Sequence, residues 1–172
     1  GYVGLNTATA LAYISKDNHV IGIDVDQSKV DSLNNRIPTI SEQGLSELLS
    51  ITSNNLSFTT DYNILTDSDV IFIAVGTPSN PDGSANMEYV NSVVENISTI
   101  SFKRDVVIVI KSTVPIGSNY AIERTLLNNS KTPNYIHFAS NPEFLREGTA
   151  LLDTLYPDRI IIGSHDDYST SI

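Results

Sequence analysis

Three segments of the sequence place polar side chains directly after apolar runs. The runs cover residues 69–75, 105–110 and 135–139, and their composition is typical of buried strands in a parallel sheet. Ligands bind beyond the carboxyl ends of such strands. We therefore expect the segments that follow to form one rim of a binding site: Val75-Gly76-Thr77-Pro78, Lys111-Ser112-Thr113-Val114-Pro115-Ile116-Gly117 and Ser140-Asn141-Pro142-Glu143-Phe144-Leu145-Arg146-Glu147-Gly148.

A fourth candidate lies at the start of the sequence, where Gly1 and Gly4 open a small, apolar, helical segment. Asp24 follows 20 positions after Gly4, at the end of the next predicted strand. In a dinucleotide-binding fold, an acid at this offset accepts hydrogen bonds from the adenosine ribose, and the helix N-terminus binds the pyrophosphate. We therefore assign a cofactor site to Gly1, Tyr2, Val3, Gly4 and Asp24.

The carboxylate of Asp24 also favours NAD over NADP, because it repels a 2′-phosphate. Lys29 is the nearby cation; it either borders the ribose or is a solvated helix residue. The alternative role for Asp24 is a cap of the helix that follows its strand.

Apolar segments alternate with helical patterns along the chain, which is typical of repeated βα units. Helices are expected over residues 1–16, 27–34, 42–49, 86–99 and 117–127, with a short helix that Asp61 caps and that ends near Leu65. Strands are expected over residues 19–24, 56–60, 69–75, 105–110, 135–139 and 159–163. The predicted fold class is α/β: a Rossmann-like, doubly wound, mostly parallel sheet with helices on both faces. No domain boundary is expected within residues 1–172.

The chain opens on Gly1, inside the glycine motif. The first glycine of the dinucleotide fingerprint and the strand before it do not precede this position. We therefore expect a fragment whose sheet has its first strand missing, with lowered stability and weaker pyrophosphate binding.

Composition excludes several classes of function. The net charge of −10 argues against nucleic acid and anionic membranes as partners. The absence of cysteine excludes disulfides and a thiol nucleophile within these residues. No apolar run reaches the ~18 residues of a membrane span, and no signal peptide opens the chain, so a cytoplasmic location is expected. His19, His137 and His165 lack ligand spacing, and we assign no metal site.

These segments resemble the amino-terminal NAD-binding domain of the UDP-glucose/GDP-mannose dehydrogenase family, over nearly all 172 residues. Among its members, the sequence is most like those that act on UDP-glucose. The string Asn-Pro-Glu-Phe-Leu-Arg-Glu-Gly at 141–148 is the most specific match. The other matching strings, in order, are residues 1–5, 22–24, 75–78, 111–117 and 157–160.

The resemblance implies an enzyme that oxidises the C6 hydroxymethyl group of a nucleotide sugar to a carboxylate, such as UDP-glucose to UDP-glucuronate, with two NAD accepting two hydrides. In the family, a cysteine captures the aldehyde stage as a thioester that water hydrolyses. That cysteine, a catalytic lysine and an asparagine belong to later domains. We therefore expect this chain to bind NAD without completing turnover. Family members dimerise through a central helix beyond Ile172, so a homodimeric parent enzyme and a monomeric fragment are expected.

Two carboxylates receive roles from the resemblance. Glu143 matches the family's general acid/base, which acts through water on the thioester step. Glu147 matches a residue on the nicotinamide side of NAD, and it shares a face with Glu143 if this stretch is helical. The alternative is an exposed acidic face with Arg146, of little energetic value.

The remaining assignments also follow the family's motifs. Thr77 and Thr113 match threonines that contact the cofactor, with Gly76 and Pro78 beside them; a plain turn is the alternative for Thr77-Pro78. The nucleotide sugar is held partly through the backbone of Glu143, Phe144, Leu145, Arg146 and Glu147. Arg159 either reaches this site or pairs with a nearby carboxylate.

Residues 35–45 depart from the family pattern, with Asn35 for a glycine and Gln43 for a proline, which changes the expected loop shape. Two alternatives to a UDP-glucose enzyme are open. One is a relative acting on a UDP-N-acetylhexosamine or GDP-mannose. The other is a non-catalytic NAD-sensing module, although a sensor has no need for Glu143 and Glu147.

Overall fold

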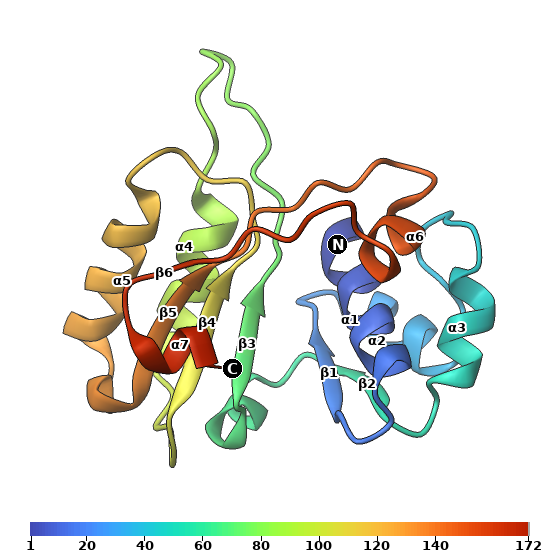
Figure 1. The fold of residues 1–172 in the computed structure, drawn as a ribbon, viewed down its shortest axis with the longest axis horizontal. Coiled ribbons are helices and arrows are strands. Elements are labelled where there is room, and N and C mark those ends of the chain that lie inside the picture. The colour runs from blue at the N-terminus through green and yellow to red at the C-terminus, as the bar shows by residue number, and fades with distance from the viewer. Residues whose placement is uncertain (172) are drawn as a thin grey trace. The chain divides into compact units, whose positions relative to one another are not determined.

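The computed structural model describes residues 1–171, and these divide into two compact units (Figure 1). The first unit combines residues 1–61 with residues 144–159, and the second combines residues 62–143 with those from Ile160 on. Each unit has its own sheet, of two and four strands respectively. Parallel strands connected by helices confirm the predicted α/β class.

The first unit is built on a pair of parallel strands. Its elements are α1 (Tyr2–Ile14), β1 (Val20–Ile23), α2 (Gln27–Asn34), α3 (Leu45–Ile51), β2 (Leu56–Thr59) and α6 (Ala150–Leu155). Val20 lies opposite Leu56 and Ile23 opposite Thr59. Helix α1 packs against β1, α3 and α6, and buried Leu5, Leu45 and Leu151 belong to one apolar core.

Side-chain hydrogen bonds fix the start of α2 and the loop that follows it. The Asp26 side chain caps α2 by accepting from the backbone N–H groups of Ser28 (2.9 Å) and Lys29 (3.4 Å). After α2, Arg36 has a left-handed φ of 61°. Its guanidinium donates to Ser53 O (3.0 Å) and Leu56 O (3.1 Å), which compensates for the strained backbone. The loop that departs from the family pattern is thus anchored by a side chain.

The second unit contains a four-stranded sheet in the order β3-β4-β5-β6. Its elements are the 3₁₀ helix η1 (Tyr62–Asp67), β3 (Val70–Ile73), α4 (Glu88–Ser98), β4 (Val106–Ile110), α5 (Ser118–Asn129), the 3₁₀ helix η2 (Pro133–Tyr135), β5 (Ile136–Ser140), β6 (Gly163–Ser164) and α7 (Asp167–Ser171). Strands β3, β4 and β5 are parallel, and Figure 1 shows them side by side with β4 in the middle. Every residue of β4 is buried, as expected for a central strand.

The register of these strands makes them end together. Ile73 lies opposite Ile110, and Ile110 lies opposite Ser140. The segments after β3, β4 and β5 therefore leave the sheet at one edge, as predicted from the three apolar runs.

One strand prediction is wrong. The apolar residues from Arg159 to Gly163 do not form a strand; β6 has only two residues and pairs antiparallel with the end of β5. Ile160, Ile161 and Ile162 are 67%, 46% and 62% exposed. β5 pairs here only with Gly163 and Ser164, so the isoleucines have no strand partner.

The segment that returns to the first unit is held by a double ion pair. Arg146 donates through Nε (3.1 Å) and Nη2 (2.6 Å) to the carboxylate of Asp153, which also accepts from the Arg146 backbone N–H. These bonds lower the pKa of Asp153 from 3.8 to about 2. The turn that carries residues 146–149 is thereby tied to the first turns of α6, which begins at Ala150.

Gly22 is where β1 approaches a ring most closely. A Cβ at this position would lie 2.6 Å from Cδ1 and 2.7 Å from Cε1 of Phe58, which is buried in the core. We expect Gly22→Ala to destabilise the protein by about 1–3 kcal/mol because the ring must move. Urea unfolding measures the change. Gly163→Ala is the control, since its Cβ would meet only Ser140 at 3.9 Å; equal stability of the two variants would contradict the prediction.

Replacing Asp153 by Asn should make the melting temperature depend less on pH in the acidic range. Because the folded pKa is lowered to about 2, the ionised carboxylate stabilises the fold above its ordinary pKa of 3.8 and loses that effect as the pH falls through about 2. We expect Asp153→Asn to lower the melting temperature at pH 7 and to match the parent near pH 2. Asp17→Asn, an exposed change of equal charge, should have little effect at either pH.

Candidate functional site

The first unit gathers the predicted ribose and pyrophosphate residues. Helix α1 begins at Tyr2, directly after Gly1, with no side-chain cap and no acid in its first turn. The N–H groups of its first turn therefore have no partner within the helix and can bind an anion. The terminal nitrogen of Gly1 lies 3.4 Å from Oδ2 of Asp24, so the start of α1 and the end of β1 are close together. Free N–H groups near a carboxylate are the groups that bind the pyrophosphate and the ribose in a dinucleotide-binding fold.

The structure separates the two roles considered for Asp24. Asp26, not Asp24, caps α2. Asp24 Oδ1 accepts from the Asp26 N–H (3.1 Å), which orients the carboxylate at the end of β1. Lys29 is half exposed, and its Nζ lies 3.8 Å from Asp26 Oδ2, so it pairs with the helix cap.

The Tyr2 side chain connects the start of α1 to two distant segments of the first unit. Its hydroxyl donates to Glu42 Oε2 and accepts from the Gly148 N–H (2.9 Å). Burial, the bond to Glu42 and the charges of Glu42 and Glu147 raise the pKa of Tyr2. Exposed Glu147 therefore lies close to Tyr2 of the glycine motif.

In the second unit, hydrogen bonds join the segments after β3 and β4. Thr77 Oγ1 donates to Thr113 O (2.7 Å), so the two predicted cofactor threonines are brought together. Ser112 Oγ donates to Val75 O (2.7 Å) and Ile73 O (3.2 Å). The segment Gly76-Thr77-Pro78 forms no turn and is thus fixed against the segment after β4.

The segment after β5 is joined to β4 by a contact that the motif analysis did not single out. Lys111 Nζ donates to Asn141 Oδ1 (3.0 Å), and Asn141 Nδ2 donates to Ile161 O (2.9 Å). Glu143, two residues further on, is half-buried. Lys111 and Asn141 lie in the matching strings, but burial of a lysine depends on distant strands that no local pattern reveals.

The helical arrangement considered for Glu143 and Glu147 is absent. Residues 141–146 form no helix, and residues 147–149 form a turn. The unit boundary falls between Glu143 and Phe144, so the proposed substrate residues Phe144, Leu145, Arg146 and Glu147 belong to the first unit. Phe144 is 53% exposed, and the Arg159 guanidinium lies 5.8 Å from its ring centre in a cation–π contact instead of an ion pair.

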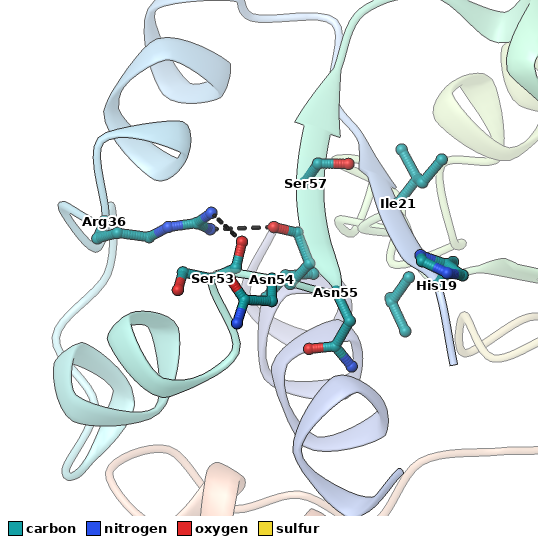
Figure 2. A pocket seen from close by; sticks show the side chains of 9 residues that line it. His19, Ile21, Arg36, Ser53, Asn54, Asn55 and Ser57 are labelled. Atoms are coloured by element: carbon teal, nitrogen blue, oxygen red, sulfur yellow. Dashed lines mark hydrogen bonds between the residues drawn. The ribbon is translucent and has the colours of Figure 1, made fainter. Parts of the chain in front are cut away.

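A hollow of about 170 Å³ in the first unit lies at the amino-terminal ends of β1 and β2, away from Asp24 (Figure 2). Figure 2 shows Arg36 reaching the backbone before β2, the contact described above. Asn55 uses its amide on Ala12 O, Ser15 O and Asn18 O. The polar side chains here hold the fold, and we assign this hollow no ligand.

Over residues 1–171, no group of three or more His, Cys, Asp or Glu side chains is arranged to hold a metal ion. In the same range, every helix is too short or too polar to cross a membrane.

Comparison with known proteins agrees with this arrangement. A UDP-glucose 6-dehydrogenase of Bacillus subtilis, YwqF, is 45% identical over 170 residues, which are 97% of this chain and 38% of the relative. The structure of a UDP-glucose dehydrogenase from Pyrobaculum islandicum has a TM-score of 0.90 at 40% identity, over 99% of this chain and 40% of that chain. A GDP-mannose dehydrogenase from Pseudomonas aeruginosa has a TM-score of 0.93 at 34% identity, over 99% and 41%. The chain thus spans about two fifths of the length of these proteins.

The model of the NAD-binding domain of the UDP-glucose/GDP-mannose dehydrogenase family matches residues 1–172. The solved relatives have the same Rossmann-like fold. NAD is the cofactor of this family. The chain belongs to the UDP-glucose/GDP-mannose dehydrogenase family, whose members are NAD-dependent nucleotide-sugar dehydrogenases.

Proposed function

We propose that this chain is the NAD-binding domain of an enzyme that oxidises the C6 hydroxymethyl group of UDP-glucose to a carboxylate. The observation that carries the proposal is the edge formed after β3, β4 and β5, where Thr77 is bonded to Thr113 and Lys111 to Asn141, two residues before Glu143. Bound NAD supplies the hydride acceptor. The identities to UDP-glucose dehydrogenases support the choice of sugar nucleotide.

Each unit contributes separate groups to this function. In the first unit, the N–H groups at Gly1–Gly4 bind the pyrophosphate, and Asp24 accepts hydrogen bonds from the adenosine ribose. Lys29 stays paired with Asp26 at the start of α2, and Glu147 faces the nicotinamide side. In the second unit, Gly76, Thr77, Pro78 and Thr113 contact the cofactor without adding charge.

Glu143 is the residue we propose for proton transfer. A half-buried carboxylate at a strand end can accept a proton from water that attacks an acyl group and return it later. Phe144, Leu145 and Arg146 hold the nucleotide sugar, mainly through backbone groups, because the Arg146 side chain is already engaged with Asp153. The cysteine nucleophile of the reaction is not among these residues.

The reaction is tested with the full-length protein by following NADH release with UDP-glucose, GDP-mannose and UDP-N-acetylmannosamine in parallel. We expect two NADH per UDP-glucose, and a rate that Glu143→Gln lowers by about 10²–10⁴-fold because general acid/base catalysis is lost. Glu95→Gln, an exposed change on α4, is the control and should leave the rate unchanged. A preference for GDP-mannose would reassign the substrate. NAD binding with no NADH release from any of the three nucleotide sugars would favour a non-catalytic NAD-sensing module.

Cofactor selection gives an independent test of Asp24. Removing the charge should weaken NAD binding by about tenfold, since a charge-assisted hydrogen bond to the ribose is lost. It should also weaken the discrimination against NADP. Isothermal titration of Asp24→Asn with both cofactors measures the two effects, with Asp17→Asn as the exposed control. An unchanged NAD to NADP affinity ratio would remove Asp24 from the ribose site.

A further inference from the structure

A lysine side chain is buried at the carboxyl end of β4. Lys111 is 9% exposed, and its backbone N–H donates to Ile73 O (2.9 Å), so it continues the pairing of β4 with β3. An ammonium group at such a place costs free energy unless polar groups compensate it. Lysine is rarely buried to this extent. The position of Lys111 beside Glu143, the proposed proton-transfer residue, therefore points to a role that needs its ammonium group.

The compensating polar group is the side chain of Asn141. The lysine has only donors, so the Asn141 oxygen must face it, and the amide nitrogen is then free to donate to Ile161 O. The Asn141 backbone N–H donates to Ile110 O (2.9 Å). Three directional bonds therefore fix Asn141 between β4 and the segment before β6, and they limit the positions that Glu143 can take two residues later.

The second contribution is electrostatic. Burial lowers the pKa of Lys111, and the negative charge of Glu143 acts in the opposite direction. The other groups known to contact this lysine are the Asn141 amide and the Ile73 carbonyl, which do not titrate. The charges of Lys111 and Glu143 therefore interact within the second unit.

We propose that Lys111 is a positioning residue for Glu143, holding the segment after β5 through Asn141 and placing a positive charge near the carboxylate. The inference rests on the proposed function, in which Glu143 takes a proton from water. Lys111 itself touches neither proton nor substrate in this scheme. A packing role would depend on the aliphatic stem of Lys111, whereas the proposed role depends on its ammonium group.

The pH–rate profile of the full-length protein separates these roles. The rate on UDP-glucose should rise with pH as Glu143 ionises. We call this rise the acidic limb of the profile. In Lys111→Met the acidic limb should move by about one pH unit to higher pH, because the Glu143 carboxylate loses a nearby positive charge. Turnover below the midpoint should then fall about tenfold. Lys111→Arg keeps the charge and should keep the limb in place. Lys131→Met is the matched loss of an exposed charge in the same unit and should change neither. A uniform loss of rate with an unmoved limb in Lys111→Met would overturn the proposal.

A second measurement does not depend on turnover. In the full-length protein with ¹³C-labelled lysine, the Cε resonance of Lys111, assigned by its loss in Lys111→Arg, reports the titration of the amine. Glu143→Gln should move that titration to lower pH, and Glu95→Gln should not. Coupling of the two groups in a protein that oxidises no sugar nucleotide would leave this inference standing and remove the proposed function. NADH formation with no shift in Glu143→Gln would overturn this inference alone.

Discussion

The parallel pairing of β3, β4 and β5 is the constraint on which the proposed catalytic edge depends. Because Ile73, Ile110 and Ser140 are opposite one another, three separate sequence motifs leave the sheet at the same level. A slip of one residue in any strand would turn its side chains to the other face.

The polar residues at this edge are already engaged before any ligand binds. Thr77 and Ser112 donate to carbonyl groups of the neighbouring segment, and Lys111 donates to Asn141. Loops joined in this way lose little further entropy on binding, so more of the interaction with a ligand contributes to affinity and orientation. In the first unit, the Tyr2 hydroxyl likewise connects the glycine motif to Gly148 before any ligand binds.

Local sequence patterns predicted the helices and strands that depend on interactions between residues close in sequence. Helix α2 has the predicted bounds because a capping side chain marks its start, and the buried strands were visible as apolar runs. The residues from Arg159 to Gly163 looked like another such run, but a strand needs a partner edge, and β5 pairs with only two residues there. Helix α6 was missed because its N-cap residue makes no capping bond and its stability comes from Leu151 in a core formed by distant residues.

The candidate site shows the same division. The glycine motif and Asp24 were predicted from sequence spacing, because the fold repeats a known strand-end geometry, whereas the threonines were assigned from the resemblance to the family. The partnership of Lys111 with Asn141 joins residues 30 positions apart through the sheet, and the separation of Glu143 from Phe144 by a unit boundary depends on tertiary packing alone.

The return of residues 144–159 to the first unit has a consequence for how the chain acquires its structure. Leu151 completes the apolar core that residues 1–61 begin, and the Tyr2 to Gly148 contact spans 146 positions. During synthesis, the core of the first unit therefore stays incomplete until residues 144–159 have emerged from the ribosome. Contacts of such sequence separation are slow to form, so the second unit, whose main strands are contiguous in sequence, has time to fold before the core of the first unit is complete.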